Sequence, residues 1–336
     1  MLKPTFIIAE ISANHGQNYN TAIKLIKKAK ESGANAVKFQ AYTPDTMTIN
    51  KNTKYFKIKH PRWGGQTLYQ LYQKASTPWE WFKSLKKYSE ELGLIFFSTA
   101  FDKTSVDFLE SLHVPMHKIA SFELGDLDLI EYIGKTKKPL IISTGMSTFE
   151  EVKAAVRTAK KAGARRITLL KCSSSYPADP QYMNLKTIRH MIQYFKLPVG
   201  LSDHTIGISS SIAAVSLGAT VIEKHFTLSR KHKTPDSFFS MEPDEFRSLV
   251  NHIRVVEKSL GKVSYGITPE ERKNLVFKRS LFVVRDMGKG ETFTRENIKS
   301  IRPNHGLPPA EITNILGKCA TKNIITGTPL NWKMVE

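Results

Sequence analysis

Cysteine is nearly absent from this 336-residue sequence, which contains only Cys172 and Cys319, in different predicted elements. A disulfide framework is therefore excluded, and two separated thiols are typical of a reducing cytosol. Long apolar runs are also absent, because no stretch reaches the roughly 18 residues of a membrane span. The amino terminus has no signal-peptide pattern, since residues 6–10 already read as a strand. We expect a cytoplasmic protein without membrane association.

Acidic residues are scarce, with 30 Asp and Glu against 50 Lys and Arg, for a formal net charge of +20. The lysines fall mainly on helical patterns such as residues 24–28 and 160–161, where they alternate with an apolar face and indicate a solvated surface. No nucleic-acid-binding motif accompanies them, so we expect no nucleic-acid partner. Part of the excess charge is assigned to steering a negatively charged substrate.

Apolar, β-branched runs recur along the first 230 residues and alternate with helical patterns. The eight runs are Phe6–Ile11, Ala36–Ala41, Leu94–Phe101, Met116–Ser121, Leu140–Thr144, Ile167–Ser173, Val199–His204 and Thr220–Phe226. Helical patterns lie between most of them, for example at Thr21–Glu31, Pro78–Leu92, Phe149–Ala162 and Ser209–Leu217. This alternation predicts a closed (β/α)8 TIM barrel. An open doubly wound sheet is the alternative, but no Gly-rich dinucleotide turn follows the first run.

Two segments break the alternation. An insertion rich in aromatic and basic residues occupies 43–76, directly after the second run, where barrel loops usually shape the active-site mouth. After Gly266 the pattern stops; short strands, turn glycines and a helix start at 294–298 predict a small β-rich domain. The predicted domains are a catalytic barrel at 1–265, a linker at 266–278 and the small domain at 279–336.

Two histidines 21 positions apart, His204 and His225, each close a predicted strand. The segment between them reads as a helix that connects two parallel strands. Parallel neighbours lie roughly 5 Å apart, so imidazoles at the same end of both can share one metal ion. Two unrelated histidines, one of them satisfied in the core, are the alternative reading.

Other polar residues also follow the ends of the predicted strands, where a TIM barrel carries its active site. These residues are Glu10, Asn14, His15, Lys38, Gln40, Ser98, Thr99, Lys118, Ser121, Glu123, Ser143, Thr144, Lys171, Ser173, Ser174, Tyr176, Ser202, Asp203, Glu223 and Lys224. Lysines beside hydroxyl groups form a cradle for phosphate and carboxylate. Glu10, Glu123 and Asp236 are the available acids and bases. The set suggests carbonyl addition chemistry on a sugar.

Six stretches of the sequence resemble the sialic acid synthase family. They are Ile8–His15, Val37–Gln40, Lys118–Ser121, Ser143–Met146, Leu201–Thr205 and Glu223–Thr227. The resemblance spans nearly the whole chain, and residues 284–303 look like the family's C-terminal SAF (antifreeze-like) domain. Within the family, Gly65–Tyr69, Thr77–Trp81 and Pro235–Pro243 are most similar to the pseudaminic acid synthases.

The resemblance implies roles for individual residues of this chain. His204 and His225 match the metal ligands, for manganese or magnesium, and Glu10, Glu123 and His225 are the expected catalytic residues. Arg302 matches an arginine that the small domain delivers to the sugar across the interface of a domain-swapped homodimer. The expected phosphoenolpyruvate contacts are Lys38, Thr99, Lys118, Ser121, Ser143, Ser174 and Ser202, and the expected sugar contacts are Gln40, Tyr176, Asp236 and Arg302.

The implied reaction is condensation of phosphoenolpyruvate with an N-acetylated amino sugar, 2,4-diacetamido-2,4,6-trideoxy-altrose for the pseudaminic subgroup. A synthase for N-acetylneuraminate or legionaminate is the alternative within the family. Two alternatives outside it are a metal-dependent aldolase and a carbohydrate-binding protein with an inactive barrel. Intact polar residues at the strand ends argue against the inactive barrel.

Overall fold

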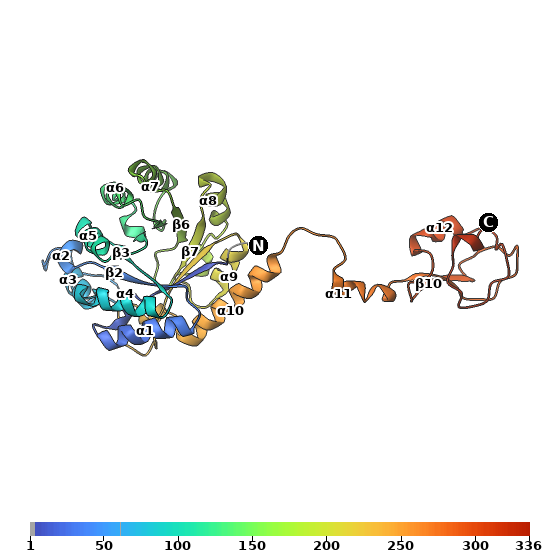
Figure 1. Ribbon diagram of the computed structural model, residues 1–336, viewed down its shortest axis with the longest axis horizontal. Helices are drawn as coiled ribbons and strands as arrows, with labels where there is room; N and C mark the ends of the chain where they lie inside the picture. Colours follow the sequence, from blue (N-terminus) through green and yellow to red (C-terminus); the bar gives the residue numbers. More distant parts are fainter. Residues whose placement is uncertain (1–3, 61) are drawn as a thin grey trace. The chain divides into compact units, whose positions relative to one another are not determined.

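A computed structural model of the protein describes residues 4–60 and 62–336, and it divides into two compact units, Met1–Gly261 and Lys262–Glu336. The first unit contains a closed barrel of eight parallel strands in chain order (Figure 1). The strands are β1 (Phe6–Glu10), β2 (Ala36–Ala41), β3 (Ile95–Ala100), β4 (His117–Ile119), β5 (Leu140–Ser143), β6 (Ile167–Cys172), β7 (Val199–Asp203) and β8 (Val221–His225). The predicted TIM barrel is therefore confirmed.

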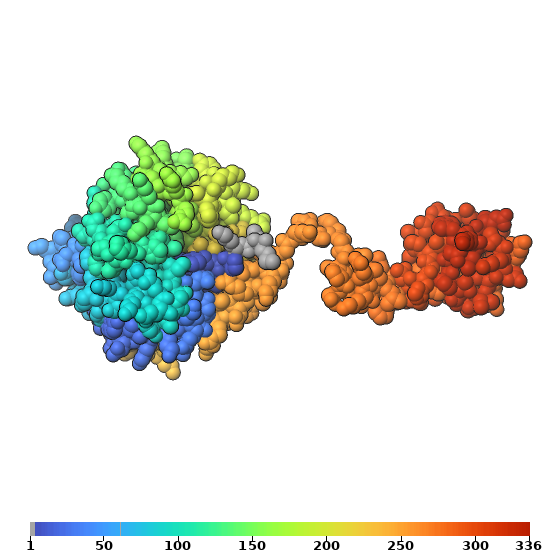
Figure 2. Space-filling view, viewed as in Figure 1, coloured from blue at the N-terminus to red at the C-terminus, as the bar shows by residue number. Residues whose placement is uncertain are grey.

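Amphipathic helices surround the barrel (Figure 1). They are α1 (Tyr19–Glu31), α2 (Pro44–Met47), α3 (Leu68–Ala75), α4 (Phe82–Glu91), α5 (Lys103–Ser111), α6 (Leu127–Lys135), α7 (Phe149–Ala162), α8 (Thr187–Phe195), α9 (Ser209–Ser216) and α10 (Pro243–Leu260). Local chemistry sets their ends. At α7, Thr148 and Glu151 form a capping box, and Gly163 ends the helix at φ 115°. The insertion at 43–76 carries α2 and α3 and protrudes from the edge of the unit, in light blue in Figure 2.

Side chains alternate between the inside and the outside of the barrel along each strand. The lower interior is apolar and is filled by a cluster that includes Ile8, Phe97 and Leu170. Two residues further along each strand, the next inward-facing side chain is polar, as at Glu10, Thr99 and Cys172. The outward side chains, such as Ile7 and Leu169, pack against the helices in the main core. Inside the barrel, an apolar layer of side chains therefore lies beneath a polar layer.

At least five of the polar strand-end residues belong to the outward parity and do not reach this layer. Lys224 and Asp203 form a buried ion pair, with Nζ and Oδ2 2.9 Å apart, and Asp203 also accepts a hydrogen bond from Ser211 of α9. The Ser98 hydroxyl donates to Phe39 O, and Thr144 and Lys171 line a groove outside the barrel. The expectation that all the strand-end groups converge on one mouth was wrong for these residues, because alternation places them on the helix side.

Replacement of Lys224 by methionine is expected to lower the free energy of unfolding by about 3 kcal/mol, because it leaves the Asp203 carboxylate buried without its charge partner. Urea denaturation followed by circular dichroism measures the change. The control is Lys153→Met, which removes an exposed pair with Glu150 and should leave the midpoint unchanged. Equal midpoints for the two variants would show that the buried pair contributes nothing.

The second unit begins with an exposed segment that contains α11 (Pro269–Arg272) and continues into a small β-rich fold. Strands β9 (Ser280–Val283) and β10 (Ile298–Ile301) pair antiparallel, α12 (Ile312–Ile315) follows, and isolated bridges join the remaining segments. A separate apolar core includes Leu281, Phe293 and Leu330.

The helix start expected at 294–298 was wrong. Residues 294–297 form a turn in which the Asn297 side chain accepts a hydrogen bond from Thr294 N and donates one to Thr292 O. Ile298 then begins β10 opposite Val283 and is buried. Cross-strand pairing and burial of Ile298 therefore override a local helix-start pattern.

In residues 4–60 and 62–336, no helix has the length and apolar character needed to cross a membrane.

Candidate functional site

Polar side chains from all eight strands, or from the loops directly after them, surround one cavity at the carboxyl end of the barrel. They include the expected residues Glu10, Lys38, Gln40, Thr99, Lys118, Ser121, Ser143, Tyr176, Ser202, His204 and His225, together with Cys172 and Glu223. A second cavity of about 290 Å³ adjoins it and shares Gln40, Tyr176 and His225 with it. The fold therefore brings together side chains that lie up to 215 positions apart, from Glu10 to His225.

Two lysines provide the positive charge of this cavity. The Lys38 ammonium lies 3.1 Å from Glu10, 3.4 Å from Glu223 and 3.0 Å from the Thr99 hydroxyl. The Lys118 ammonium donates to Ser143 Oγ at 2.7 Å and lies 3.6 Å from Glu223. Burial lowers the pKa of Lys118. Two ammonium groups beside hydroxyls can bind the phosphate and carboxylate of one small anion.

The carboxylates beside the lysines have different pKa values. Burial alone would raise the pKa of Glu223, but the charges of Lys118 and Lys38 outweigh it and hold the pKa below its usual value. Burial raises the pKa of Glu10 to about 7, although Lys38 opposes this shift. Glu10 also accepts a hydrogen bond from Gln40 at 2.9 Å. Glu223 therefore stays ionised, whereas Glu10 can exchange a proton near neutral pH.

A glycine allows two of the serines to approach the layer. Gly145 N donates to Ser121 Oγ at 3.0 Å. A Cβ on Gly145 would lie 2.3 Å from Ser174 Oγ and 2.8 Å from Ser121 Oγ, so any other residue would displace these hydroxyls. The absence of a side chain at Gly145 therefore lets the Ser121 and Ser174 hydroxyls approach this turn, although of these two only Ser121 lines the first cavity.

His225 is the last residue of β8, and His204 directly follows β7. Their ring centroids are 5.3 Å apart. His204 Nδ1 is 2.8 Å from the Ser173 carbonyl oxygen, which can only accept, so Nδ1 carries a proton. Burial alone would lower the pKa of His204, but Cys172 and the hydrogen bond to Ser173 O outweigh it and hold the pKa above its usual value. In the neutral ring, Nε2 is the nitrogen with the lone pair. Burial lowers the pKa of His225 well below its usual value, which keeps this imidazole neutral. The rings of Tyr176 and Phe239 pack against both histidines.

These histidines fit a partial metal site. His225 Nδ1 is buried without a hydrogen-bond partner, and a carbonyl oxygen fixes the tautomer of His204, as is typical of metal ligands. In the part of the chain that the structure describes, no group of three or more His, Cys, Asp and Glu side chains has the arrangement of a metal site. A divalent ion here would therefore have two protein ligands and open positions, as expected for a catalytic site.

Glu123 lies beyond β4, in a short 3-10 helix, and faces the second cavity. Burial raises its pKa to about 7, and its Oε2 is buried without a hydrogen-bond partner. A carboxyl group that is half ionised near neutral pH and has a free oxygen is suited to accept or donate a proton.

The second cavity has one polar wall and one aromatic wall. Asp236 forms the polar wall and accepts a hydrogen bond from Ser12 Oγ at 2.5 Å. The other wall comprises Tyr42, Met47, Trp63, Leu71, Tyr72 and Phe101. A hydrogen bond of 2.8 Å from Trp63 Nε1 to Pro235 O joins the insertion to the loop after β8. The cavity therefore suits a polar molecule that carries methyl groups.

Sequence reasoning missed several residues of this site. Ser12 and Tyr42 directly follow β1 and β2, which could have identified them, but Met47 and Leu71 lie deep in the insertion and have no local signal. Cys172 also lines the first cavity, and its Sγ lies 3.8 Å from His204 Nδ1. Phe239 packs on His225.

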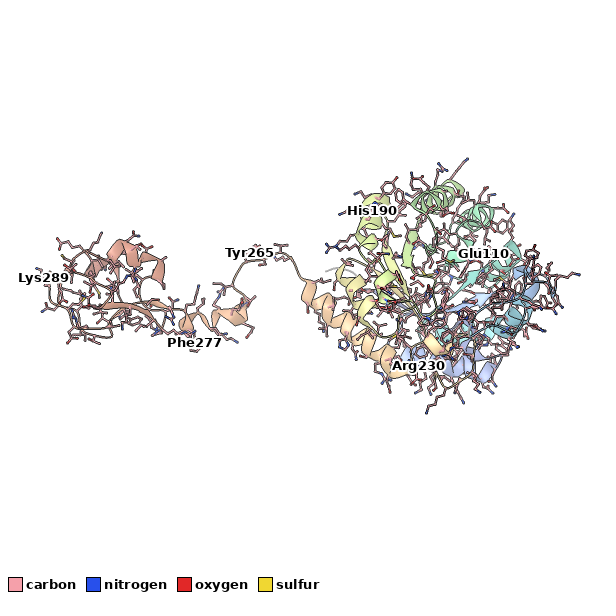
Figure 3. The ribbon with its side chains drawn as sticks, turned by 180° about the vertical axis from the view of Figure 1, so that it is seen from behind. Glu110, His190, Arg230, Tyr265, Phe277 and Lys289 are labelled. Carbon is pink, nitrogen blue, oxygen red and sulfur yellow. The ribbon has the colours of Figure 1, made fainter. Side chains whose placement is uncertain are left out.

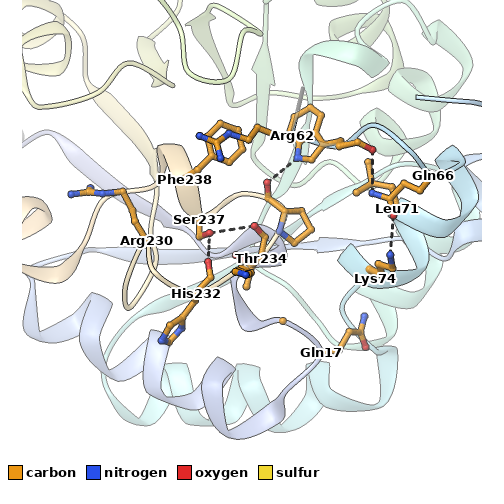
Figure 4. Close-up of a pocket in the computed structure, with 14 residues that line it drawn as sticks. Gln17, Arg62, Gln66, Leu71, Lys74, Arg230, His232, Thr234, Ser237 and Phe238 are labelled. Atoms are coloured by element: carbon orange, nitrogen blue, oxygen red, sulfur yellow. Dashed lines mark hydrogen bonds between the residues drawn. The ribbon is translucent and has the colours of Figure 1, made fainter. Parts of the chain in front are cut away.

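A separate pocket of about 630 Å³ lies between the insertion and the loop after β8. Figure 4 shows Arg62 and Lys74 of the insertion and Arg230 and His232 of the loop around it. Arg230 is neutralised by two contacts with Glu245, at 2.5 and 2.8 Å. Because the pocket shares Trp63, Leu71 and Pro235 with the second cavity, its positive charge lies next to the barrel mouth.

Arg302 lies in the second unit, directly after β10, and is exposed. It is the one expected site residue outside the barrel unit.

Two family profiles match the chain: NeuB family at residues 25–265 and SAF domain at residues 278–336. The pseudaminic acid synthase of Helicobacter pylori is 45% identical over 100% of this chain and 99% of its own length. That of Campylobacter jejuni serotype O:2 is 43% identical over 98% of this chain and 96% of its own. The crystal structure of N-acetylneuraminic acid synthetase from Leptospira borgpetersenii has a TM-score of 0.73 and 32% identity, and the match covers 81% of this chain and 90% of that one.

Proposed function

The chain belongs to the NeuB family and carries a SAF domain, and on that basis we propose that it condenses phosphoenolpyruvate with 2,4-diacetamido-2,4,6-trideoxy-altrose to give pseudaminic acid and phosphate. The observation that carries this proposal is the polar layer in which Lys38 and Lys118 lie in the same cavity as His204 and His225. Identity of 43–45% to two pseudaminic acid synthases over nearly the whole chain supports the choice of sugar.

In this proposal the lysine layer binds phosphoenolpyruvate. Lys38 and Lys118 neutralise its phosphate and carboxylate, and the hydroxyls of Thr99, Ser143 and the neighbouring serines orient the two groups. The Glu223 carboxylate contacts both ammonium groups, 3.4 Å from Lys38 and 3.6 Å from Lys118. The anion is thus held with its C3 carbon facing the adjoining cavity, ready to attack the aldehyde carbon of the open-chain sugar.

His204 and His225 would hold the divalent ion, manganese or magnesium. When bound there, the ion supplies Lewis-acid polarisation of the sugar aldehyde. The surrounding residues prepare both ligands: the Ser173 carbonyl orients His204, and Phe239 and Tyr176 hold the plane of His225. Glu10 lies directly across from His225 in the β1–β8 pairing and can exchange a proton at the same end of the barrel.

The adjoining cavity would bind the sugar. Gln40, Tyr176 and Asp236 provide polar contacts, and the aromatic wall provides surface for the C6 methyl and acetamido methyl groups. A sugar with hydroxyls in these places would lose hydrogen bonds to water without replacement. This wall favours the diacetamido sugar over N-acetylmannosamine.

The test is phosphate release from phosphoenolpyruvate with a divalent metal and a panel of amino sugars. We expect turnover with the diacetamido altrose sugar and a kcat/KM at least about tenfold lower with N-acetylmannosamine. Turnover with N-acetylmannosamine alone would indicate a neuraminate synthase instead. Retention of phosphate in the product, or use of pyruvate, would indicate an aldolase.

After C3 has attacked the aldehyde, water adds at C2, and cleavage of the C2–O bond of the tetrahedral intermediate releases phosphate. Glu123 is assigned as the base that takes a proton from this water. Because burial raises its pKa to about 7, it is protonated below that pH and acts as a base only above it. The kcat/KM of the protein, which reports groups of the free enzyme, should therefore rise with pH through about 7. Glu123→Gln is expected to lower kcat about 100-fold and to remove this rise. If the rise persists in the variant, the titrating group is another one, and Glu10→Gln identifies it.

We further propose a domain-swapped homodimer in which each SAF domain supplies Arg302 to the sugar cavity of the partner barrel. Large apolar side chains on four consecutive loops at the barrel mouth support a covering partner: Phe122 is 62% exposed, Met146 64%, Tyr182 66% and Ile206 60%. The proposed substrate phosphoenolpyruvate, a cytosolic metabolite, and the two free cysteines support a cytoplasmic location.

A mixture of two inactive variants tests the swap. Lys118→Met inactivates the barrel and Arg302→Ala inactivates the small domain. In a swapped heterodimer, one site combines both defects and the other is wild type. Unfolding and refolding equal amounts together should therefore restore about a quarter of the wild-type activity, since half of the dimers are mixed. Recovery of no activity would show that each barrel uses its own small domain.

A further inference from the structure

Lys171 is the penultimate residue of β6, and its side chain points away from the barrel interior. Its chain neighbour Cys172 lines the polar cavity, whereas Lys171 lines a groove of about 1010 Å³ on the outside of the barrel. Residues of α7 and α8, and of the loops that precede these helices, line the groove.

The groove combines an apolar body with polar ends. Phe149 and Val152 of α7 line one side, and Met191 and Phe195 of α8 line the other. Figure 3 shows His190, which also lines the groove, on the outer surface at α8. The polar groups are at the strand ends and the α8 entry: Thr144, Ser147, Lys171, Gln181, Asn184, Lys186 and Thr187. This lining is of the kind that binds small organic molecules.

The Lys171 side chain is half-buried, and its ammonium forms no ion pair among the residues that the structure describes. Its one hydrogen bond within the described residues goes to the carbonyl oxygen of Cys172, at 2.9 Å, and no carboxylate of residues 4–60 or 62–336 lies within ion-pair distance. Burial lowers its pKa, as expected for a partly desolvated ammonium. By contrast, the other outward lysine of the strand ends, Lys224, is paired with Asp203. A half-buried cation without a partner is a costly arrangement that a bound anion would relieve.

We propose that this groove binds a small amphipathic carboxylate, whose carboxylate pairs with Lys171 and whose apolar part packs between Phe149 and Met191. A single buried ammonium matches one carboxylate, and Lys186 at the rim adds to the positive potential. A polyphosphate would require more donors than the groove supplies, and a neutral apolar ligand would leave Lys171 unpaired.

The site adjoins the segment that orients a residue of the barrel cavity. Lys171 Nζ holds the carbonyl of Cys172, and the next carbonyl, that of Ser173, accepts the hydrogen bond from His204. A ligand that draws Lys171 into the groove releases the first of these carbonyls. Occupancy of the groove is therefore coupled to the position of His204 through one peptide unit.

Isothermal titration calorimetry of the full-length protein tests the proposal with two probes of one shape, 3-phenylpropionate and its neutral amide. We expect the acid to bind with one site per chain and the amide to bind at least about tenfold more weakly. Lys171→Met should weaken acid binding by the same factor and leave amide binding unchanged. Lys171→Arg, which keeps the charge, should restore acid binding to within about threefold. Lys160→Met, an exposed lysine of α7 outside the groove, should bind both probes like the wild type.

Repeating the titration at saturating phosphoenolpyruvate distinguishes binding of the acid in the groove from binding in the barrel cavity. Unchanged acid binding supports the groove, whereas displacement of the acid would place it in the lysine layer and overturn the proposal. Equal binding of acid and amide, wild-type binding by Lys171→Met, or no saturable binding of the acid would also overturn it. Melting curves of each variant show whether it is folded. None of these measurements requires turnover, so the result is independent of the proposed reaction.

Discussion

Replacement of His225 by alanine is expected to lower kcat/KM about 1,000-fold and to remove the bound divalent metal. The reason is that the cavity offers two imidazole ligands, and the loss of one leaves a single ligand, His204, in a site with no further His, Cys, Asp or Glu group arranged to replace it among the described residues. Lewis-acid polarisation is worth several kcal/mol, which corresponds to about three orders of magnitude in rate. Phosphate release measures activity, and elemental analysis of the purified protein measures metal content.

A second buried histidine provides the control. His117 lies on β4 but faces outward, where it contacts Glu110 at 2.7 Å. His117→Asn should therefore reduce stability while it keeps the metal content and kcat of the folded protein. If His225→Ala retained its metal, or more than about a tenth of the activity, the assignment of the two histidines would be wrong.

Replacement of Lys118 by methionine is expected to lower kcat/KM for phosphoenolpyruvate by up to about 1,000-fold. Lys118 is one of two ammonium groups in the cavity, and the variant would place the substrate's negative charge next to Glu223 with only Lys38 to oppose it. Loss of one preorganised donor at a developing charge costs about 100- to 1,000-fold. Steady-state kinetics with varied phosphoenolpyruvate measures the effect.

Lys138→Met is the matched control for Lys118→Met. Lys138 is a partly buried lysine that pairs with Glu110 outside the barrel, at 2.7 Å. Its loss should leave kcat/KM within about twofold of the wild type. A Lys118→Met variant with normal kcat/KM and a normal melting temperature would exclude Lys118 from phosphoenolpyruvate binding.

The order of elements could be predicted from the sequence because it depends on local chemistry. The eight apolar runs, their spacing and the glycine at the end of a helix such as α7 are properties of short segments. Each of the eight barrel strands lies within its predicted run. The prediction of a helix start at 294–298 was wrong because the conformation there is not set locally. Ile298 pairs with Val283, a partner 15 positions away.

The direction of side chains could not be predicted from the strands. In a parallel barrel both faces of each strand are buried, so the apolar runs show no alternation that would identify the inner face. Lys118 and Lys224 illustrate this, because both are about 2% exposed and both lie within predicted strands. Lys118 donates a hydrogen bond to Ser143 in the polar layer, whereas Lys224 forms a buried ion pair with Asp203 on the helix side.

The sequence by itself determined that this chain forms a barrel with polar strand ends and two histidines on adjacent strands, because propensity, patterning and motif spacing are local. Tertiary structure decided which of the polar residues form one site. Closure of the barrel brings Glu10 opposite His225, and the insertion places Leu71 and Trp63 against the second cavity. Tertiary structure also leaves Lys171 outside, in a groove where no carboxylate of the described residues pairs with it, since a strand that directs Cys172 inward must direct its neighbour outward.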